Sequence, residues 1–297
     1  MKRFAVIFPI LSGTFWGSCG IFVRSLSGAE LNNITILFLR AFVSTIFLLF
    51  LILLKDRSLL KINLRDLPLF LSFAINGITI MNFFYNLAMN TVSLSLAAVL
   101  LSTCPVFVMI IAAVLFGEKI TPLKVSCMLA TIAGCFMLSG VLDGKEMIVS
   151  GIGILFGIGA AVFNAIYITT VKALTNRNYN NLTILFYGFM FASVVLLFFC
   201  DFRAVGSFVK AEPLYGITLI ISQSAVSTLL PNLLFTKGMQ YMESGKVTVF
   251  SSGAEPVSAM LFGLFIYKEV PTVFGILGLI TVITALTVLT LKGEKTE

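Results

Sequence analysis

Two charged residues lie deep inside long apolar stretches of the sequence. Glu255 stands about nine residues, or ~13 Å of helix, into one stretch, and Arg40 about seven residues, or ~10 Å, into another. A charge within a bilayer is costly unless it faces a cavity or a partner, so both residues favour a functional role. Glu255 could recognise a cation or amine or carry a proton, and its structural alternative is an ion pair with Lys237. Arg40 could bind a carboxylate through its planar guanidinium, or lock helix packing by donating to backbone carbonyls.

Amide and aromatic side chains in the same apolar stretches could form the wall of a polar cavity. Asn82 and Tyr85, for example, are three residues apart and therefore share one helix face. Each residue alone could instead join two helices through a hydrogen bond, worth about 0.6 kcal/mol. As a set, they predict a cavity. With Arg40 and Glu255, the predicted substrate-binding residues are Trp16, Asn82, Tyr85, Asn164, Tyr167, Gln223 and Asn232.

Several kinds of chemistry are excluded by what the sequence lacks. It has no histidine, which removes histidine-based acid–base catalysis and histidine metal ligands. None of its five cysteines has CxxC spacing, so neither a zinc site nor a disulfide framework is expected. No P-loop motif is present, so the protein is not expected to bind ATP and use its hydrolysis as a direct source of energy for its activity. We therefore predict no cofactor, no metal and no catalytic residue.

The composition is that of a membrane protein. Of 297 residues, 59% are hydrophobic and 11% are charged, whereas a soluble domain has about 25% charged residues. This excludes a soluble globular domain, a disordered chain and a nucleic-acid-binding protein. The net charge of +7 is then interpreted through the positions of loops, because positive loops face the cytoplasm.

The apolar stretches are long enough to be membrane-spanning helices. A helix needs about 20 apolar residues to cross ~30 Å of hydrocarbon. We interpret the first stretch as an uncleaved helix, because it is too long for a signal peptide and has no Ala-x-Ala site. A polar patch at residues 90–93 divides an uncharged region into two spans. The ten expected spans are 4–23, 34–54, 67–89, 94–117, 122–141, 148–171, 181–200, 213–236, 246–267 and 271–291.

Loop charges predict the orientation. Arg40 lies within a span, and the other nineteen of the 20 Lys and Arg residues divide fourteen to five between the two sides. The fourteen lie on the side that holds both termini. The sequence therefore predicts a multi-pass protein of the cytoplasmic membrane with both termini in the cytoplasm.

An internal repeat organises these spans. The heptapeptide at 32–38 recurs at 180–186, an offset of 148 that grows to 151 further along the chain. The chain is therefore expected to consist of two five-helix halves, 1–142 and 148–297. Because five is odd, the halves are inverted, as is typical of secondary transporters with a site near the midplane. Further matched pairs are Asn82 with Asn232, Met89 with Met239, Pro105 with Pro256, and Glu118 with Glu269.

Pro105 and Pro256 are predicted to lie within helices at equivalent positions of the two halves. Each frees the carbonyl four residues earlier, at Leu101 and Ser252. Such a kink suits a helix that lines a cavity, although proline is also frequent in ordinary transmembrane helices.

Short motifs, in order along the chain, carry a resemblance to a known family: Trp16-Gly17, Arg40, Pro105 with Gly117-Glu118, Leu234-Phe235-Thr236-Lys237-Gly238, and Glu255-Pro256 with Lys268-Glu269. On these residues the sequence resembles the drug/metabolite transporter superfamily, specifically the EamA family, over essentially its full length. The resemblance implies ten helices, a central cavity and export or uptake of small metabolites, with amino acids or related compounds as the expected cargo. The halves differ in polar chemistry, since Gly188 stands where Arg40 does, and Cys104 where Glu255 does.

The sequence therefore favours an all-α secondary transporter that moves a small molecule by alternating access. Its expected partners are a small-molecule substrate, the lipid bilayer and protons coupled through Glu255, although uncoupled facilitated diffusion is equally compatible. A passive channel is the first alternative. A polytopic membrane enzyme is the second, and it is disfavoured because it would need clustered carboxylates or an acid–base pair.

Overall fold

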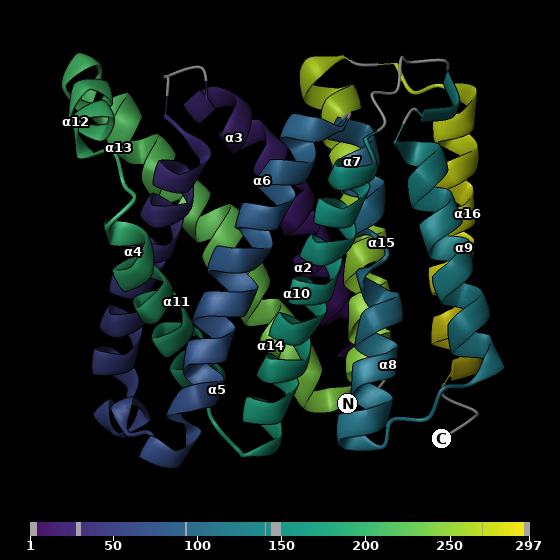
Figure 1. Cartoon of the computed structure of the whole chain (residues 1–297), viewed down its shortest axis with the longest axis horizontal. Coiled ribbons are helices and arrows are strands. Elements are labelled where there is room, and N and C mark those ends of the chain that lie inside the picture. Colours follow the sequence, from purple (N-terminus) through teal and green to yellow (C-terminus); the bar gives the residue numbers. More distant parts are fainter. Residues whose placement is uncertain are drawn as a thin grey trace.

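Long apolar helices run side by side through the molecule (Figure 1). The computed structural model describes residues 5–27, 31–92, 94–139, 141–143, 150–268 and 270–293, and no strand occurs within these ranges. Judged by length and composition, six of the described helices could cross a membrane, or seven if one bent pair counts as a single span. Three shorter apolar helices accompany them. The described part of the chain is all-helical, and its apolar helices are those of a multi-pass membrane protein.

Helices occupy most of each predicted apolar stretch, but the stretches at 4–23 and 94–117 are each broken into two helices. One helix ends at Thr91 and the next begins at Leu94, close to the division expected at 90–93. The first part of the chain forms α2 (Ile7–Gly17), α3 (Cys19–Ser27), α4 (Asn33–Lys55), α5 (Leu67–Ser72), α6 (Met81–Thr91), α7 (Leu94–Leu101), α8 (Cys104–Phe116) and α9 (Pro122–Leu138). The rest forms α10 (Gly151–Asn176), α11 (Asn181–Leu197), α12 (Phe202–Ala211), α13 (Pro213–Ser222), α14 (Leu230–Tyr241), α15 (Ser244–Tyr267) and α16 (Val273–Gly293).

The repeated heptapeptide begins α4 and α11, which pack against each other. Asn32 Oδ1 accepts a hydrogen bond from the Thr35 amide at 2.8 Å, and Asn180 Oδ1 accepts one from the Leu182 amide at 3.0 Å. A side-chain oxygen at this position satisfies an amide that the helix itself leaves unpaired. The two asparagines therefore set where these helices begin.

Two segments of wider, π-helical turns interrupt the helices that carry Asn82 and Asn232. They are η3 (Phe73–Ile80), between α5 and α6, and η5 (Gln223–Leu229), between α13 and α14. Each asparagine side chain donates to the carbonyl four residues earlier, Asn82 to Ile78 and Asn232 to Thr228, both at 2.7 Å. π-Helical turns are rare and often mark functional sites, and here both precede a predicted cavity residue.

The prolines behave differently from each other, which corrects the prediction that both lie inside helices. The helix breaks after Leu101, so Pro105 lies in the first turn of α8, where a missing backbone amide costs little. Pro256 does lie within α15. The carbonyl of Ser252, which Pro256 leaves without its helical donor, lies 3.8 Å from the Cys135 thiol sulfur, which donates to it.

The segment between the spans predicted at 181–200 and 213–236 is a helix rather than a loop. This helix, α12, is bent by 102° from α11. Asp201 begins it by accepting from the Arg203 and Ala204 amides at 3.0 and 3.1 Å, while the Asp201 amide donates to Thr35 Oγ1 at 2.9 Å. Phe208 packs on the apolar core. An amphipathic helix of this kind suits the membrane interface.

Polar contacts join helix ends at the edge of the bundle where α2 begins and α16 ends, the lower edge in Figure 1. The Glu118 carboxylate accepts from the Ser244 amide at 2.9 Å, from Ser244 Oγ at 2.6 Å and from the Gly245 amide at 3.2 Å. It thereby ties the end of α8 to the start of α15. Glu269, the expected counterpart of Glu118, lies outside the described residues.

Candidate functional site

A cavity of ≈ 260 Å³ lies among the helices, slightly smaller than the ligand pockets of about 300–1,000 Å³ that are common in proteins. Its walls come from both halves of the sequence, whereas α9 and α16 contribute none of the described lining residues. Eight of the nine predicted substrate-binding residues line it: Trp16, Arg40, Asn82, Tyr85, Asn164, Tyr167, Asn232 and Glu255. The structure thus brings together residues that are far apart in the sequence.

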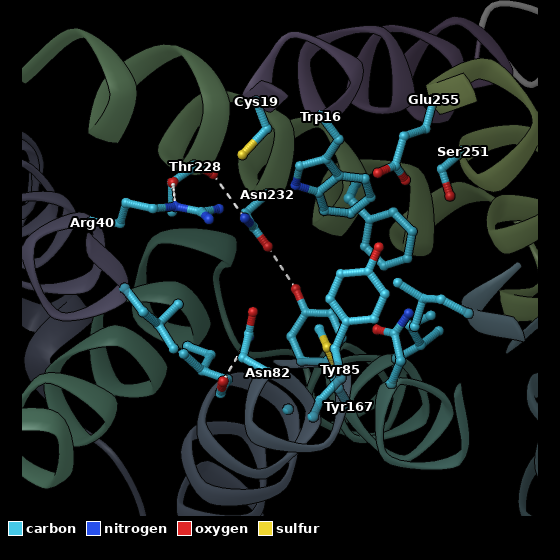
Figure 2. A pocket seen from close by; sticks show the side chains of 18 of the residues that line it. Trp16, Cys19, Arg40, Asn82, Tyr85, Tyr167, Thr228, Asn232, Ser251 and Glu255 are labelled. Carbon is cyan, nitrogen blue, oxygen red and sulfur yellow. Dashed lines mark hydrogen bonds between the residues drawn. The ribbon is translucent and has the colours of Figure 1, made fainter. Parts of the chain in front are cut away.

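A chain of hydrogen bonds runs along one side of the cavity (Figure 2). Arg40 Nε donates to Thr228 Oγ1 at 2.7 Å. The carbonyl of Thr228 accepts from Asn232 Nδ2 at 2.7 Å, and Asn232 Oδ1 accepts from the Tyr167 hydroxyl at 2.6 Å. The chain joins α4, η5, α14 and α10. It therefore fixes the Arg40 guanidinium relative to three other wall elements.

Glu255 lies on the opposite wall from Arg40 (Figure 2). The accessible surface of its side chain opens into the cavity, and within the described chain its carboxylate forms no hydrogen bond or ion pair. The expected structural alternative, an ion pair with Lys237, is absent from the described residues. Lys237 Nζ instead lies 5.1 Å from the centre of the Phe8 ring, in a cation–π contact. The carboxylate is therefore available to a molecule in the cavity.

Aromatic rings make up much of the remaining wall. Trp16 packs against Phe235 with ring centroids 5.2 Å apart, and both residues line the cavity. Tyr167 packs edge-on against Phe73 with centroids 5.0 Å apart. Tyr85 points its ring toward the side that carries Glu255 (Figure 2). The cavity can therefore offer apolar surface as well as charges.

Glycine at position 77 is required by the close approach of η3 to α10. A Cβ built on Gly77 would lie 2.5 Å from Tyr167 Cδ2, which is far inside van der Waals contact. The absence of a side chain lets Tyr167 sit where its hydroxyl reaches Asn232. Gly77 thus acts on the cavity through the position of Tyr167.

The remaining predictions have different outcomes. Gln223 does not line the cavity; it is buried in η5, and its Nε2 has no hydrogen-bond partner in the described part of the chain. Neither Pro105 nor Pro256 lines the cavity, but Leu101 and Ser252, four residues before each, both do.

Sequence reasoning missed several lining residues, of which Thr228 is the one bonded to a charge. Thr228 precedes Asn232 by four residues, and residues at that spacing share a helix face. This spacing from a predicted cavity residue could have identified Thr228 from the sequence. Among the described residues, no group of three or more His, Cys, Asp or Glu side chains could hold a metal ion.

Comparisons with known proteins agree with this architecture. The model of the EamA-like transporter family matches residues 3–140 and 151–291. An uncharacterized transporter of Archaeoglobus fulgidus is 28% identical over 276 residues, which cover 92% of this chain and 93% of that protein. A solved crystal structure superposes with a TM-score of 0.80 at 16% identity, covering 99% of this chain and 98% of the other. That likeness concerns the fold alone.

The two family matches together cover most of the chain, and they confirm the resemblance seen in the sequence motifs. The match of this family to an apolar, multi-helical chain also supports a membrane transporter over an enzyme. The chain belongs to the EamA-like transporter family.

Proposed function

We propose that this membrane transporter is a secondary transporter that carries a small zwitterionic metabolite, with amino acids as the leading class, by alternating access. The observation that carries the proposal is the placement of Arg40 and Glu255 on opposite walls of one cavity. Neither residue has a charged partner within the described chain.

Two unpaired opposite charges in one cavity of a membrane protein favour a ligand that carries both a negative and a positive group. An uncompensated charge in a poorly solvated site is destabilising, so a ligand that supplies the counter-charge gains from both interactions. A carboxylate suits the planar guanidinium of Arg40, and an ammonium suits the carboxylate of Glu255. The aromatic wall can then accommodate an apolar side chain of the metabolite.

Alternating access requires two parts that move relative to each other around the site. We propose ten membrane spans in two inverted halves, 1–142 and 148–297. The family matches at 3–140 and 151–291 support this division. The π-helical segments support it as well, because Gln223 follows Phe73 by 150 residues, the offset that separates Asn232 from Asn82. Inverted repeats around a central site are typical of secondary transporters.

The proposed orientation places both termini in the cytoplasm and the protein in the cytoplasmic membrane. The distribution of Lys and Arg among the loops supports this orientation. The start of α2 and the end of α16 lie at one edge of the bundle (Figure 1), as an even number of crossings requires.

Glu255 is also the proposed site of proton coupling, because it is the one carboxylate among the cavity-lining residues described. A proton and the substrate ammonium would then compete for the same oxygens. Uncoupled facilitated diffusion remains the second candidate, since the same cavity would serve it.

A thermal-shift panel tests the proposed substrate class. The purified protein is melted with each of the twenty standard L-amino acids, their amides and their decarboxylated amines, because a bound ligand raises the melting temperature. We expect at least one amino acid to stabilise the protein more than its amide or its amine. Lys237→Gln, which alters an exposed lysine outside the cavity, should respond as the wild type does. Equal stabilisation by amine and amino acid would contradict the role of Arg40, and no stabilisation by any amino acid would contradict the proposed class.

A further inference from the structure

Thr228 differs from many hydroxyl residues of the helices because it accepts a hydrogen bond from a charged side chain. Thr45, Thr169 and Thr236 each donate to the carbonyl four residues earlier in their own helix. Thr228 Oγ1 instead accepts from Arg40 Nε at 2.7 Å, and within the described chain it donates to no acceptor. The hydroxyl of Thr228 is therefore directed at Arg40 on another helix.

The use of Nε leaves the other edge of the Arg40 guanidinium open. Within the described chain neither terminal nitrogen of Arg40 forms a hydrogen bond, and Figure 2 shows the guanidinium reaching from α4 toward Thr228 and Asn232. An arginine holds a carboxylate best through two parallel N–H···O bonds, which need the guanidinium plane to be fixed. A hydrogen bond at Nε supplies that constraint.

Thr228 is itself held in place through Asn232. It lies in η5, and its carbonyl accepts from Asn232 Nδ2 at 2.7 Å. Asn232 is 7% exposed, and its oxygen accepts from the Tyr167 hydroxyl at 2.6 Å. Rigid support of this kind is what keeps a recognition group in its productive geometry.

We propose that Thr228 is a positioning residue that sets the preference of this cavity for a carboxylate. It holds Nε of Arg40, so that the two terminal nitrogens meet the carboxylate of the substrate. This inference rests on the proposed function, because it assumes that the transported molecule binds through a carboxylate at Arg40.

The test compares binding of an L-amino acid and its amide to single variants. The probe is the amino acid that stabilises the wild type most, and the readout is the ratio of the two dissociation constants. Thr228→Val removes the hydroxyl and keeps the shape, and we expect the preference for the acid to fall about tenfold, as the loss of one hydrogen bond to a charged group predicts. Thr228→Ser keeps the hydroxyl and should restore the ratio. The matched control is Thr236→Val on the same membrane-crossing segment, whose hydroxyl bonds Asn232 O.

A second pair of variants covers the case in which Thr228→Val does not fold. For Thr228→Ala we expect the same ratio of the two dissociation constants as for Thr228→Val. Arg40→Lys keeps the charge but lacks Nε, so adding Thr228→Ala to Arg40→Lys should change the ratio no further. An unchanged ratio in Thr228→Val or Thr228→Ala would overturn the role of Thr228 and leave the proposed function standing. No stabilisation of the wild type by any amino acid would overturn both.

Discussion

Arg40 and Glu255 face one cavity from opposite walls, and neither is neutralised by another residue of the described chain. In a soluble protein two such groups could be left to water. Within a membrane bundle their charges must be met by the contents of the cavity. This relationship links the fold of the transporter to its proposed cargo.

The first prediction concerns coupling. Glu255→Gln removes the charge and the ability to exchange a proton while keeping the size of the side chain. We expect transport by proteoliposomes to be largely lost, and any transport that remains to be nearly independent of pH between mildly acidic and mildly alkaline conditions. Glu212→Gln, an exposed acid outside the cavity lining, should keep the wild-type profile. A wild-type rate and pH profile in Glu255→Gln would contradict the coupling role.

The second prediction concerns packing behind the cavity. Gly77→Ala would place a methyl group 2.5 Å from Tyr167 Cδ2, so the ring must move and its bond to Asn232 must weaken. Overpacking of this kind costs about 1–3 kcal/mol, so the melting temperature should fall and substrate affinity with it. Gly206→Ala on α12 is the control, because its Cβ would meet nothing within 4 Å. Equal melting temperatures for the two variants would contradict this account of Gly77.

The third prediction concerns the contact between α8 and α15. Glu118→Ala removes three hydrogen bonds to Ser244 and Gly245 at the start of α15. Loss of such a helix cap costs about 0.5–2 kcal/mol, and a thermal melt in detergent should show the decrease. Glu212→Ala, whose side chain bonds no described group, should melt as the wild type does. If Glu118→Ala were as stable as Glu212→Ala, the capping role would be wrong.

The fourth prediction concerns the orientation in the membrane. On a background without native cysteines, Lys61→Cys should react with an impermeant thiol reagent only from the cytoplasmic side, and Lys145→Cys only from the outside. The positive charge of the loop at 55–65 is the reason for this assignment. Labelling of Lys145→Cys from the inside alone would overturn the topology.

Most helices were predictable because lipid imposes one simple rule, that about 20 apolar residues form a crossing helix. The amphipathic helix α12 was not, because its apolar residues alternate with polar ones and no long apolar stretch marks it. Pro105 was misjudged for another reason. A proline can kink a helix or begin a new one, and the choice depends on the packing of the residues before it.

The cavity residues were largely predictable, because a polar side chain within an apolar stretch is costly unless it faces a cavity or a polar partner. Gln223 and Thr228 show the limit of that reasoning, because it considers the type of a residue and not the helix face on which it lies. Gln223 precedes Asn232 by nine residues, about two and a half helical turns, and it lies outside the cavity. Thr228, an ordinary residue for a membrane helix, precedes Asn232 by four residues, shares its face and reaches Arg40.

The central claim is that Arg40 and Glu255 hold the two ends of one transported molecule. Counterflow in proteoliposomes preloaded with an amino acid identified by the thermal-shift panel tests it most directly. The account predicts saturable exchange by the wild type, and loss of that exchange in both Arg40→Gln and Glu255→Gln, with Lys237→Gln unaffected. Wild-type exchange in both cavity variants, or a linear and non-saturating flux in the wild type, would contradict it.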